Sequence, residues 1–199
     1  MNPLTSVKGS ITTGFVLAIL ISIALTTVAG GDVGIHHAQV ARWLHIVAGV
    51  MWIGLLYYFN VVQVPGLAAA AADKGGPGGA GVTKYIAPLA LLWFRWAAVA
   101  TWVTGAYYLM MFYGSIHKAF MLAPDMRTIG VGAWLGTIML FNVWVLIWPN
   151  QKKILGLVAA TDEEKAKARK VALYASRTNF ILSIPMLMCM SGHTHTLPF

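Results

Sequence analysis

The stretch MWIGLLYYFNVV (residues 51–62) returns later in the chain as AWLGTIMLFNVW (133–144), and this repeat decides the predicted fold. Both copies carry Trp-x-Gly followed by Phe-Asn-Val, and every identity is separated by 82 residues. The same separation pairs Arg95 with Arg177. Each repeat unit holds two apolar segments, so both copies enter a membrane from the same side. We therefore expect two copies of one helical hairpin, related by a pseudo-two-fold axis along the membrane normal.

Apolar segments dominate the chain. Only 10% of its 199 residues are charged, against about a quarter in soluble domains. A bilayer-spanning helix needs about 20 apolar residues, and suitable runs lie at 11–30, 42–64, 86–113, 129–149 and 178–194. The sequence therefore predicts an all-α fold: one transmembrane domain over residues 1–199, with five helices of which the last four form the repeated hairpins.

Lysine and arginine are shared unevenly between the predicted loops. If the N-terminus is cytoplasmic, the inner segments hold ten of these residues and the outer segments hold three: Arg42, Lys118 and Arg127. The positive-inside rule then predicts a cytoplasmic N-terminus and a periplasmic C-terminus in a bacterial inner membrane. The net charge of +8 is thus a sign of topology and not of nucleic-acid binding.

Two further segments can be interpreted from their composition. The first apolar run is longer than the roughly 7–15 apolar residues of a signal peptide, so we expect a retained helix. Residues 161–176 begin with acidic side chains and continue with basic ones. That order is typical of a helix whose ends match its dipole, and it predicts a short amphipathic helix on the membrane surface.

Six histidines lie at or near the predicted outer face. His45 lies about three residues into the second run, and His193 lies about 24 Å beyond the inner edge of the fifth. The two therefore fall at similar depth on helices that run in opposite directions. Imidazoles placed in this way can bind a haem iron from opposite faces, and helix-bundle cores hold such cofactors. We expect haem b without covalent attachment, because the sequence has no C-x-x-C-H motif.

Other interpretations of the histidines stay open. A single interfacial histidine can simply hydrogen-bond to lipid headgroups or to a neighbouring helix. His36, His37, His193 and His195 together offer imidazoles for copper or zinc at an aqueous face. His195 is also the alternative haem ligand, but two residues of helix turn it about 200° from His193. We therefore do not expect both to face one haem.

Arg95 lies inside the third run, where a charge is costly unless it is paired or hydrated. Its expected partners are polar groups of neighbouring helices: Asn60, Asn142, Asn179 or backbone carbonyls. We also expect the asparagines at 60 and 142 to bond between helices. Small residues permit close helix packing, and this is the expected role of Gly54, Gly105 and Gly136.

Separate motifs occur in a recognisable order over residues 42–195. They are Arg42-Trp43-Leu44-His45, Trp52-Ile53-Gly54, Phe94-Arg95-Trp96, Gly132-Ala133-Trp134-Leu135-Gly136, Arg177-Thr178-Asn179 and Ser191-Gly192-His193. In this order they resemble the membrane domain of the bacterial membrane-bound, cytochrome-c-linked urate oxidase (urate hydroxylase) family, without its C-terminal cytochrome c domain. A helix with Leu-His and then Trp-x-Gly is more distantly similar to haem-binding membrane proteins of the protoporphyrinogen oxidase and copper-resistance type. The resemblance implies an oxidoreductase membrane module with a cytochrome c as electron partner.

The leading hypothesis is a b-type haem membrane protein for electron transfer or oxidoreductase chemistry near the outer face. His45 and His193 would bind the iron, and the other candidate cofactor-binding residues are Arg42 and Arg127 beside the propionates, Trp52 and Arg95. One alternative is a non-catalytic accessory subunit of a larger membrane complex, and another is a copper- or zinc-binding membrane protein. The expected partners are the lipid bilayer and a cytochrome c or other membrane subunits.

Overall fold

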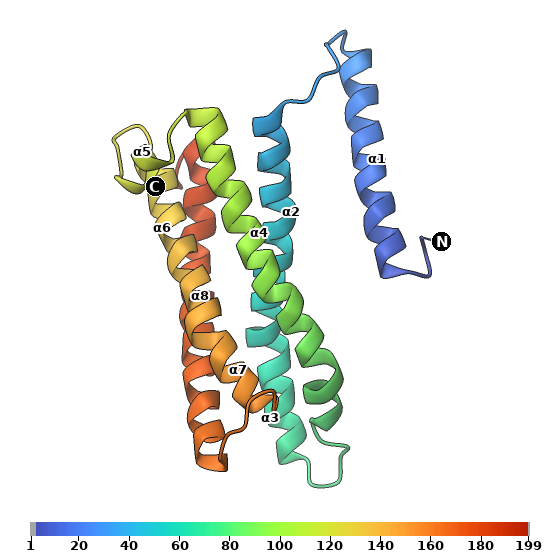
Figure 1. Ribbon diagram of the computed structural model, residues 1–199, viewed down its shortest axis with the longest axis vertical. Coiled ribbons are helices and arrows are strands. Elements are labelled where there is room, and N and C mark those ends of the chain that lie inside the picture. The colour runs from blue at the N-terminus through green and yellow to red at the C-terminus, as the bar shows by residue number, and fades with distance from the viewer. Residues whose placement is uncertain (1–2, 199) are drawn as a thin grey trace. The chain divides into compact units, whose positions relative to one another are not determined.

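The computed structural model describes residues 3–198, and in that part of the chain the regular structure is entirely helical (Figure 1). Five helical stretches are long and apolar enough to cross a membrane: Val7–Val28, His37–Ala72, Val82–Tyr113, Arg127–Ile154 and Asp162–His195. This confirms the predicted five-helix transmembrane fold, and the chain is an integral membrane protein.

The helices divide into shorter elements. Helix α1 spans Val7–Val28, and the second stretch consists of α2 (His37–Tyr57), the π-helical segment η1 (Tyr58–Gln63) and α3 (Val64–Ala72). The third consists of η2 (Val82–Ile86) and α4 (Ala87–Tyr113), followed by the short helix α5 (Ile116–Phe120). The fourth consists of α6 (Arg127–Phe141), η3 (Asn142–Ile147) and α7 (Trp148–Ile154), and α8 (Asp162–His195) forms the fifth.

The chain forms two compact units, one ending at His36 and one beginning at His37. The first contains α1, whose N-terminus is capped by the Ser6 hydroxyl as it accepts a hydrogen bond from the Gly9 N–H (3.3 Å). No residue of α1 is buried, and its most apolar window has a mean hydropathy of 2.2. A helix that is apolar on every side is typical of a membrane span.

The second unit is a four-helix bundle. Helix α2 packs along α4 and α6 packs along α8, with narrower contacts between α4 and α6 and between α2 and α8. The two repeated hairpins are therefore confirmed as packing units, and the helices form a ring in the order α2, α4, α6, α8. Repeat-equivalent helices lie diagonally across this ring, as a pseudo-two-fold axis requires. The buried core between them includes Trp52, Leu56, Phe94, Met139 and Val143.

Proline sets the position of each π-helical segment. Pro65, Pro88 and Pro149 each lie two residues after the end of η1, η2 and η3 respectively. Proline lacks an N–H group, and its ring collides with the carbonyl four residues earlier in an α-helix. The wider π turn moves that carbonyl away. The helices therefore continue past the prolines without breaking.

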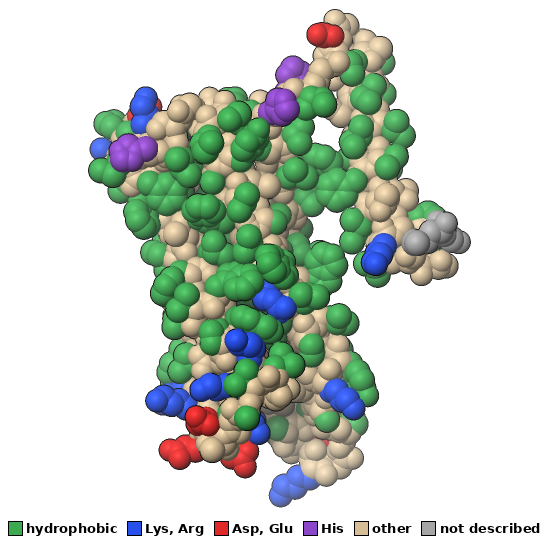
Figure 2. Space-filling model, in the orientation of Figure 1, with side chains coloured by type: hydrophobic (Ala, Val, Ile, Leu, Met, Phe, Trp, Pro, Cys, Tyr) green, Lys and Arg blue, Asp and Glu red, His purple; other side chains and the backbone are tan. Residues whose placement is uncertain are grey.

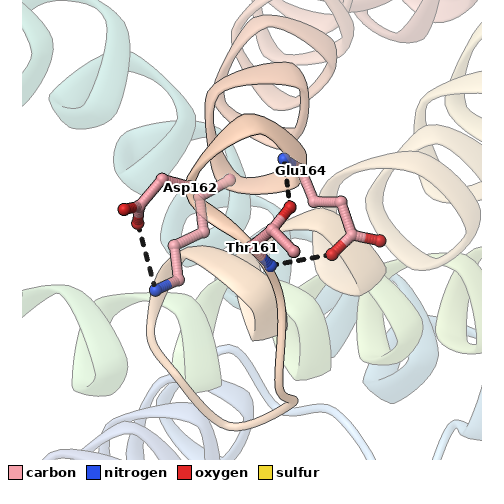
Figure 3. A network of polar contacts seen from close by, with 4 residues as sticks. Thr161, Asp162 and Glu164 are labelled. Carbon is pink, nitrogen blue, oxygen red and sulfur yellow. Dashed lines mark hydrogen bonds and ion pairs between the residues drawn. The ribbon is translucent and has the colours of Figure 1, made fainter.

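The last helix differs from the sequence prediction. A capping box begins it: the Thr161 hydroxyl accepts from the Glu164 N–H (3.2 Å), and the Glu164 carboxylate accepts from the Thr161 N–H (2.8 Å; Figure 3). From there α8 runs unbroken for 34 residues, about 51 Å. The separate surface helix predicted for residues 161–176 is therefore wrong. Because no glycine or proline occurs before Pro185 in this helix, nothing ends the helix where the hydropathy changes.

The two ends of the bundle carry different side chains. Lys84, Lys152, Lys153 and the charged start of α8 gather at one end, which Figure 2 shows in blue and red. We call it the lysine end. The opposite end, where α2 begins and α8 finishes, carries His45 and His193, and we call it the histidine end. The roughly 30 Å between two bilayer interfaces is shorter than α8, so its charged first turns extend beyond the hydrocarbon.

Candidate functional site

A cavity of about 590 Å³ opens at the histidine end of the bundle. Helices α2, α4, α6 and α8 supply its walls, and Phe120 of α5 adds to them. Most of the lining is aliphatic, aromatic or glycine, with a few polar groups: Arg42, His45, Thr101, Tyr108, Tyr113, Ser191, His193, Thr194 and His195. Cavities of about 300–1,000 Å³ with apolar walls and few polar groups are typical of cofactor sites.

His45 is held in one orientation by α4. Its Nδ1 lies 2.7 Å from the backbone oxygen of Thr101, and its ring lies directly against Gly105. A Cβ atom at Gly105 would be only 2.7 Å from two ring atoms, so this close approach requires glycine. Because a carbonyl only accepts hydrogen bonds, neutral His45 carries its proton on Nδ1 and keeps the lone pair on Nε2. That is the state in which histidines bind metals.

His193 lies in the last turn of α8 and is half-buried. The centroid of its ring is 5.3 Å from that of Tyr113, with the two rings edge to face. Beyond the helix, Thr196 has a φ of 65°, and the chain turns back so that Leu197 covers Gly192. A Cβ at Gly192 would be 2.7 Å from the Leu197 side chain, so glycine permits this turn.

A hydrogen bond between η1 and α8 shows that the two histidines have similar depth. The Asn60 amide donates to the Ser176 hydroxyl at 2.9 Å, which places these residues level. At 1.5 Å per residue, His45 lies about 22 Å from Asn60 toward the histidine end, and His193 lies about 26 Å from Ser176 in the same direction. The two histidines are therefore within about 4 Å in depth, on neighbouring helices.

The cavity gathers some of the predicted site residues and leaves others elsewhere. Arg42, Trp52, His45 and both terminal histidines of α8 line it. His195 does so together with His193, although the two were not expected to face one haem, because the cavity extends to the end of α8. The lining, within residues 3–198, does not include the remaining candidates: Arg95, Arg127 and His37. His36 belongs to the first unit.

Arg95 has a partner that the sequence prediction did not include. Its guanidinium carbon lies 3.9 Å from the centre of the Trp148 ring, a cation–π contact that partly offsets the cost of the charge. The asparagines bond elsewhere: Asn60 to Ser176, and the Asn142 amide to the Asn179 side chain at 2.8 Å. These two bonds join different helices, as predicted.

Two glycines have a different role from the predicted one. A Cβ at Gly54 or at Gly136 would meet nothing within 4 Å, so neither glycine serves close helix packing. Both line the cavity, and they are the repeat-equivalent glycines of the two Trp-x-Gly motifs. The repeat therefore widens the cavity from opposite helices. The identity of the two glycines at a constant offset is visible in the sequence, but there it was interpreted as a sign of close helix packing.

The histidines do not form a cluster of protein ligands around a metal ion. Among residues 3–198, no group of three or more His, Cys, Asp or Glu side chains is close enough to bind one. Zinc sites use at least three protein ligands. A haem iron differs in this respect, since the macrocycle supplies four ligands and the protein needs to supply only one or two.

The fold and the site define a class: a polytopic helical membrane protein whose bundle encloses a cofactor-sized cavity with histidines in its wall. The chain belongs to the family described as urate oxidase N-terminal, whose model matches residues 35–130 and 125–198. This confirms the family resemblance of the motifs and marks an oxidoreductase-related membrane protein. Neither the curated proteins nor the solved structures contain a match to this chain.

Proposed function

We propose that the protein is a membrane-embedded b-type haem protein that transfers electrons at the histidine end of its bundle. One observation carries the proposal. Two histidines at similar depth, on neighbouring helices, line a single cavity, and one of them has its Nδ1 fixed by a backbone carbonyl. Family membership in an oxidoreductase-related group supports the same reading.

The residues present fit a haem. His45 would bind the iron through Nε2, which its bond to Thr101 leaves free, and His193 would bind from the other face. The apolar walls suit the macrocycle, and the room beside Gly54 and Gly136 suits a flat ring. When bound, a haem supplies one-electron chemistry at its iron. The protein would hold that iron with two imidazoles, exclude water from it, and leave no open position for a substrate.

Arg42 would hold the carboxylates of the haem at the rim of the cavity. It lines the cavity, and it is exposed at the start of α2. An arginine there satisfies an anionic group that cannot enter the apolar walls. Arg127 lies outside the lining, so within this proposal it has no contact with the cofactor.

The histidine end would face the periplasm of a bacterial inner membrane. The ten lysines and arginines assigned to the inner segments support this orientation through the positive-inside rule. A haem at that end lies close to the outer water phase, where a cytochrome c or another redox subunit can reach it. These partners belong to the proposal and follow from the position of the cavity and the family.

An absorption spectrum of the purified full-length protein tests the proposal. We expect a Soret band and the spectrum of low-spin, six-coordinate haem. His45→Ala should abolish haem retention, because it removes the fixed ligand. His193→Ala should lose haem or give a high-spin spectrum, because the iron keeps at most one imidazole.

His117→Ala is the matched control, since His117 is exposed on α5 at the same end and lies outside the lining. Its spectrum should equal that of the wild type. Unchanged spectra in both the His45 and His193 variants would rule out the two-histidine site. A protein that binds no haem at all would favour the accessory-subunit alternative. Copper or zinc found by metal analysis would favour the alternative of a copper- or zinc-binding membrane protein.

A further inference from the structure

The cavity has one open side, and that side lies between α2 and α8. On the other walls no lining residue is exposed: Thr101 (7% exposed) and Leu109 (6%) of α4 are buried, and the rest of the lining on α4, α5 and α6 is buried or half-buried. On α2 the lining includes Ile46, 53% exposed, and Val50, 71% exposed, and on α8 it includes Leu187, 43% exposed. Side chains that line a cavity and are also exposed mark its opening.

Side-chain contacts that join α2 and η1 to α8 explain why this side is open. Three of them lie toward the lysine end: the Tyr57 hydroxyl and the Ser183 hydroxyl are 3.2 Å apart, the Tyr57 and Phe180 rings are 4.9 Å apart, and Asn60 of η1 bonds to Ser176. From there toward the histidine end, the two helices flank the cavity. We call the opening between residues 42–54 of α2 and 187–195 of α8 the α2–α8 slot.

The slot faces hydrocarbon over most of its length. It extends about 18 Å along α2, more than half of a bilayer core of about 30 Å. Its rim is apolar at Ile46, Val50 and Leu187. Toward the histidine end it becomes polar, with Arg42 exposed on α2 and with Ser191, Thr194 and His195 exposed on α8. A molecule suited to the slot is therefore apolar at the end that faces the hydrocarbon and anionic at the edge that lies near Arg42.

Haem has this chemistry: a flat apolar ring with two carboxylates along one edge. We infer that haem enters the protein sideways from the bilayer through the α2–α8 slot, ring first, with its carboxylates held near Arg42 at the interface. This inference rests on the proposed function and adds the route and the orientation of the cofactor. Because the carboxylates stay at the interface, no charged group has to cross the hydrocarbon, where a charge is costly.

The rate of haem uptake tests the route separately from the site. Full-length apoprotein in liposomes is mixed with liposomes that contain haem, and the growth of the Soret band is followed. Val50→Trp places a large side chain on the rim, where 71% exposure gives it room to be accommodated without disturbing the core. We expect uptake to slow by about tenfold, or about 1.4 kcal/mol in activation free energy.

Val47→Trp is the matched control. Val47 lies on the same helix and is 40% exposed, but it is not part of the cavity lining, so its variant should take up haem at the wild-type rate. Leu187→Trp provides a second test from the opposite rim and should also slow uptake. Equal rates in the wild type and in all three variants would overturn the route.

The outcomes separate the route from the proposed function. A wild type that takes up no haem contradicts the proposed function itself. A wild type that binds haem, together with a Val50→Trp variant that binds none even at equilibrium, contradicts the route, because the residue then belongs to the binding surface. Slow uptake from liposomes with fast uptake of haem from aqueous albumin also contradicts it, since that result means entry from water.

Discussion

Gly105→Ala tests how far the position of His45 depends on α4. The new Cβ would lie 2.7 Å from two atoms of the His45 ring, whereas ordinary contacts begin at 3.4 Å. The ring must therefore move by about 0.7 Å. Its hydrogen bond to Thr101, 2.7 Å long, lengthens or bends as it moves.

The magnitudes predict that stability and haem affinity respond differently. Losing the hydrogen bond costs about 0.5–1.5 kcal/mol. Replacing a helical glycine by alanine returns about 0.5–1 kcal/mol, so the free energy of unfolding should change little. Loss of the group that orients a metal ligand typically lowers metal affinity about 10–100-fold. We therefore expect Gly105→Ala to fold as the wild type does and to bind haem about 10–100-fold more weakly.

Haem titration of the apoprotein, followed at the Soret band, measures the affinity, and denaturant unfolding followed by circular dichroism measures the stability. Gly66→Ala on α3 is the control, because a Cβ there meets nothing within 4 Å and the residue lies away from the cavity. An affinity within twofold of the wild type would refute the reasoning, since His45 would then not need its contact with α4. A large loss of stability would refute it in a different way, by showing that the clash disturbs the helix pair.

Two further predictions concern topology and the interior of the bundle. A reporter fused to the C-terminus should be active only when it works in the periplasm, because the positive-inside rule places the N-terminus in the cytoplasm; a reporter active only in the cytoplasm would reverse the orientation. Asn179→Ala should destabilise the bundle by about 1–2 kcal/mol in a denaturation series, because Asn179 is fully buried, donates to the Met139 carbonyl (2.9 Å) and accepts from Asn142. An unchanged midpoint would show that these bonds contribute nothing to helix association.

The sequence predicts the spans and the hairpins well because both depend on local patterns. Twenty apolar residues in a row have few alternatives to a membrane helix, and an identity at constant offset, as between Asn60 and Asn142, reports a shared environment. Both asparagines are indeed buried and bond to α8. The shared depth of His45 and His193 also follows from counting residues along straight helices.

Features that depend on contacts between distant residues were not predictable in the same way. The partner of Arg95 is Trp148, which a search for polar groups in neighbouring spans does not include. The course of α8 was missed because its end was placed where the hydropathy changes. The hydrogen bonds of a helix continue through such a change unless a residue such as glycine or proline stops them.

The segment that joins the two hairpins breaks their symmetry. Duplicating a hairpin produces openings in pairs, so the slot between α2 and α8 has an equivalent position between α6 and α4. That position is occupied: α5 packs against α6 so closely that a Cβ at Gly130 would collide with the Ala119 carbonyl, and Trp134 donates to the Phe120 carbonyl at 2.9 Å. Leu109 and Met126 form a small apolar cluster with Ala119 of α5. The two repeated hairpins therefore leave the cavity at the histidine end with one entrance instead of two, and a ligand of this cavity should bind with a stoichiometry of one per chain.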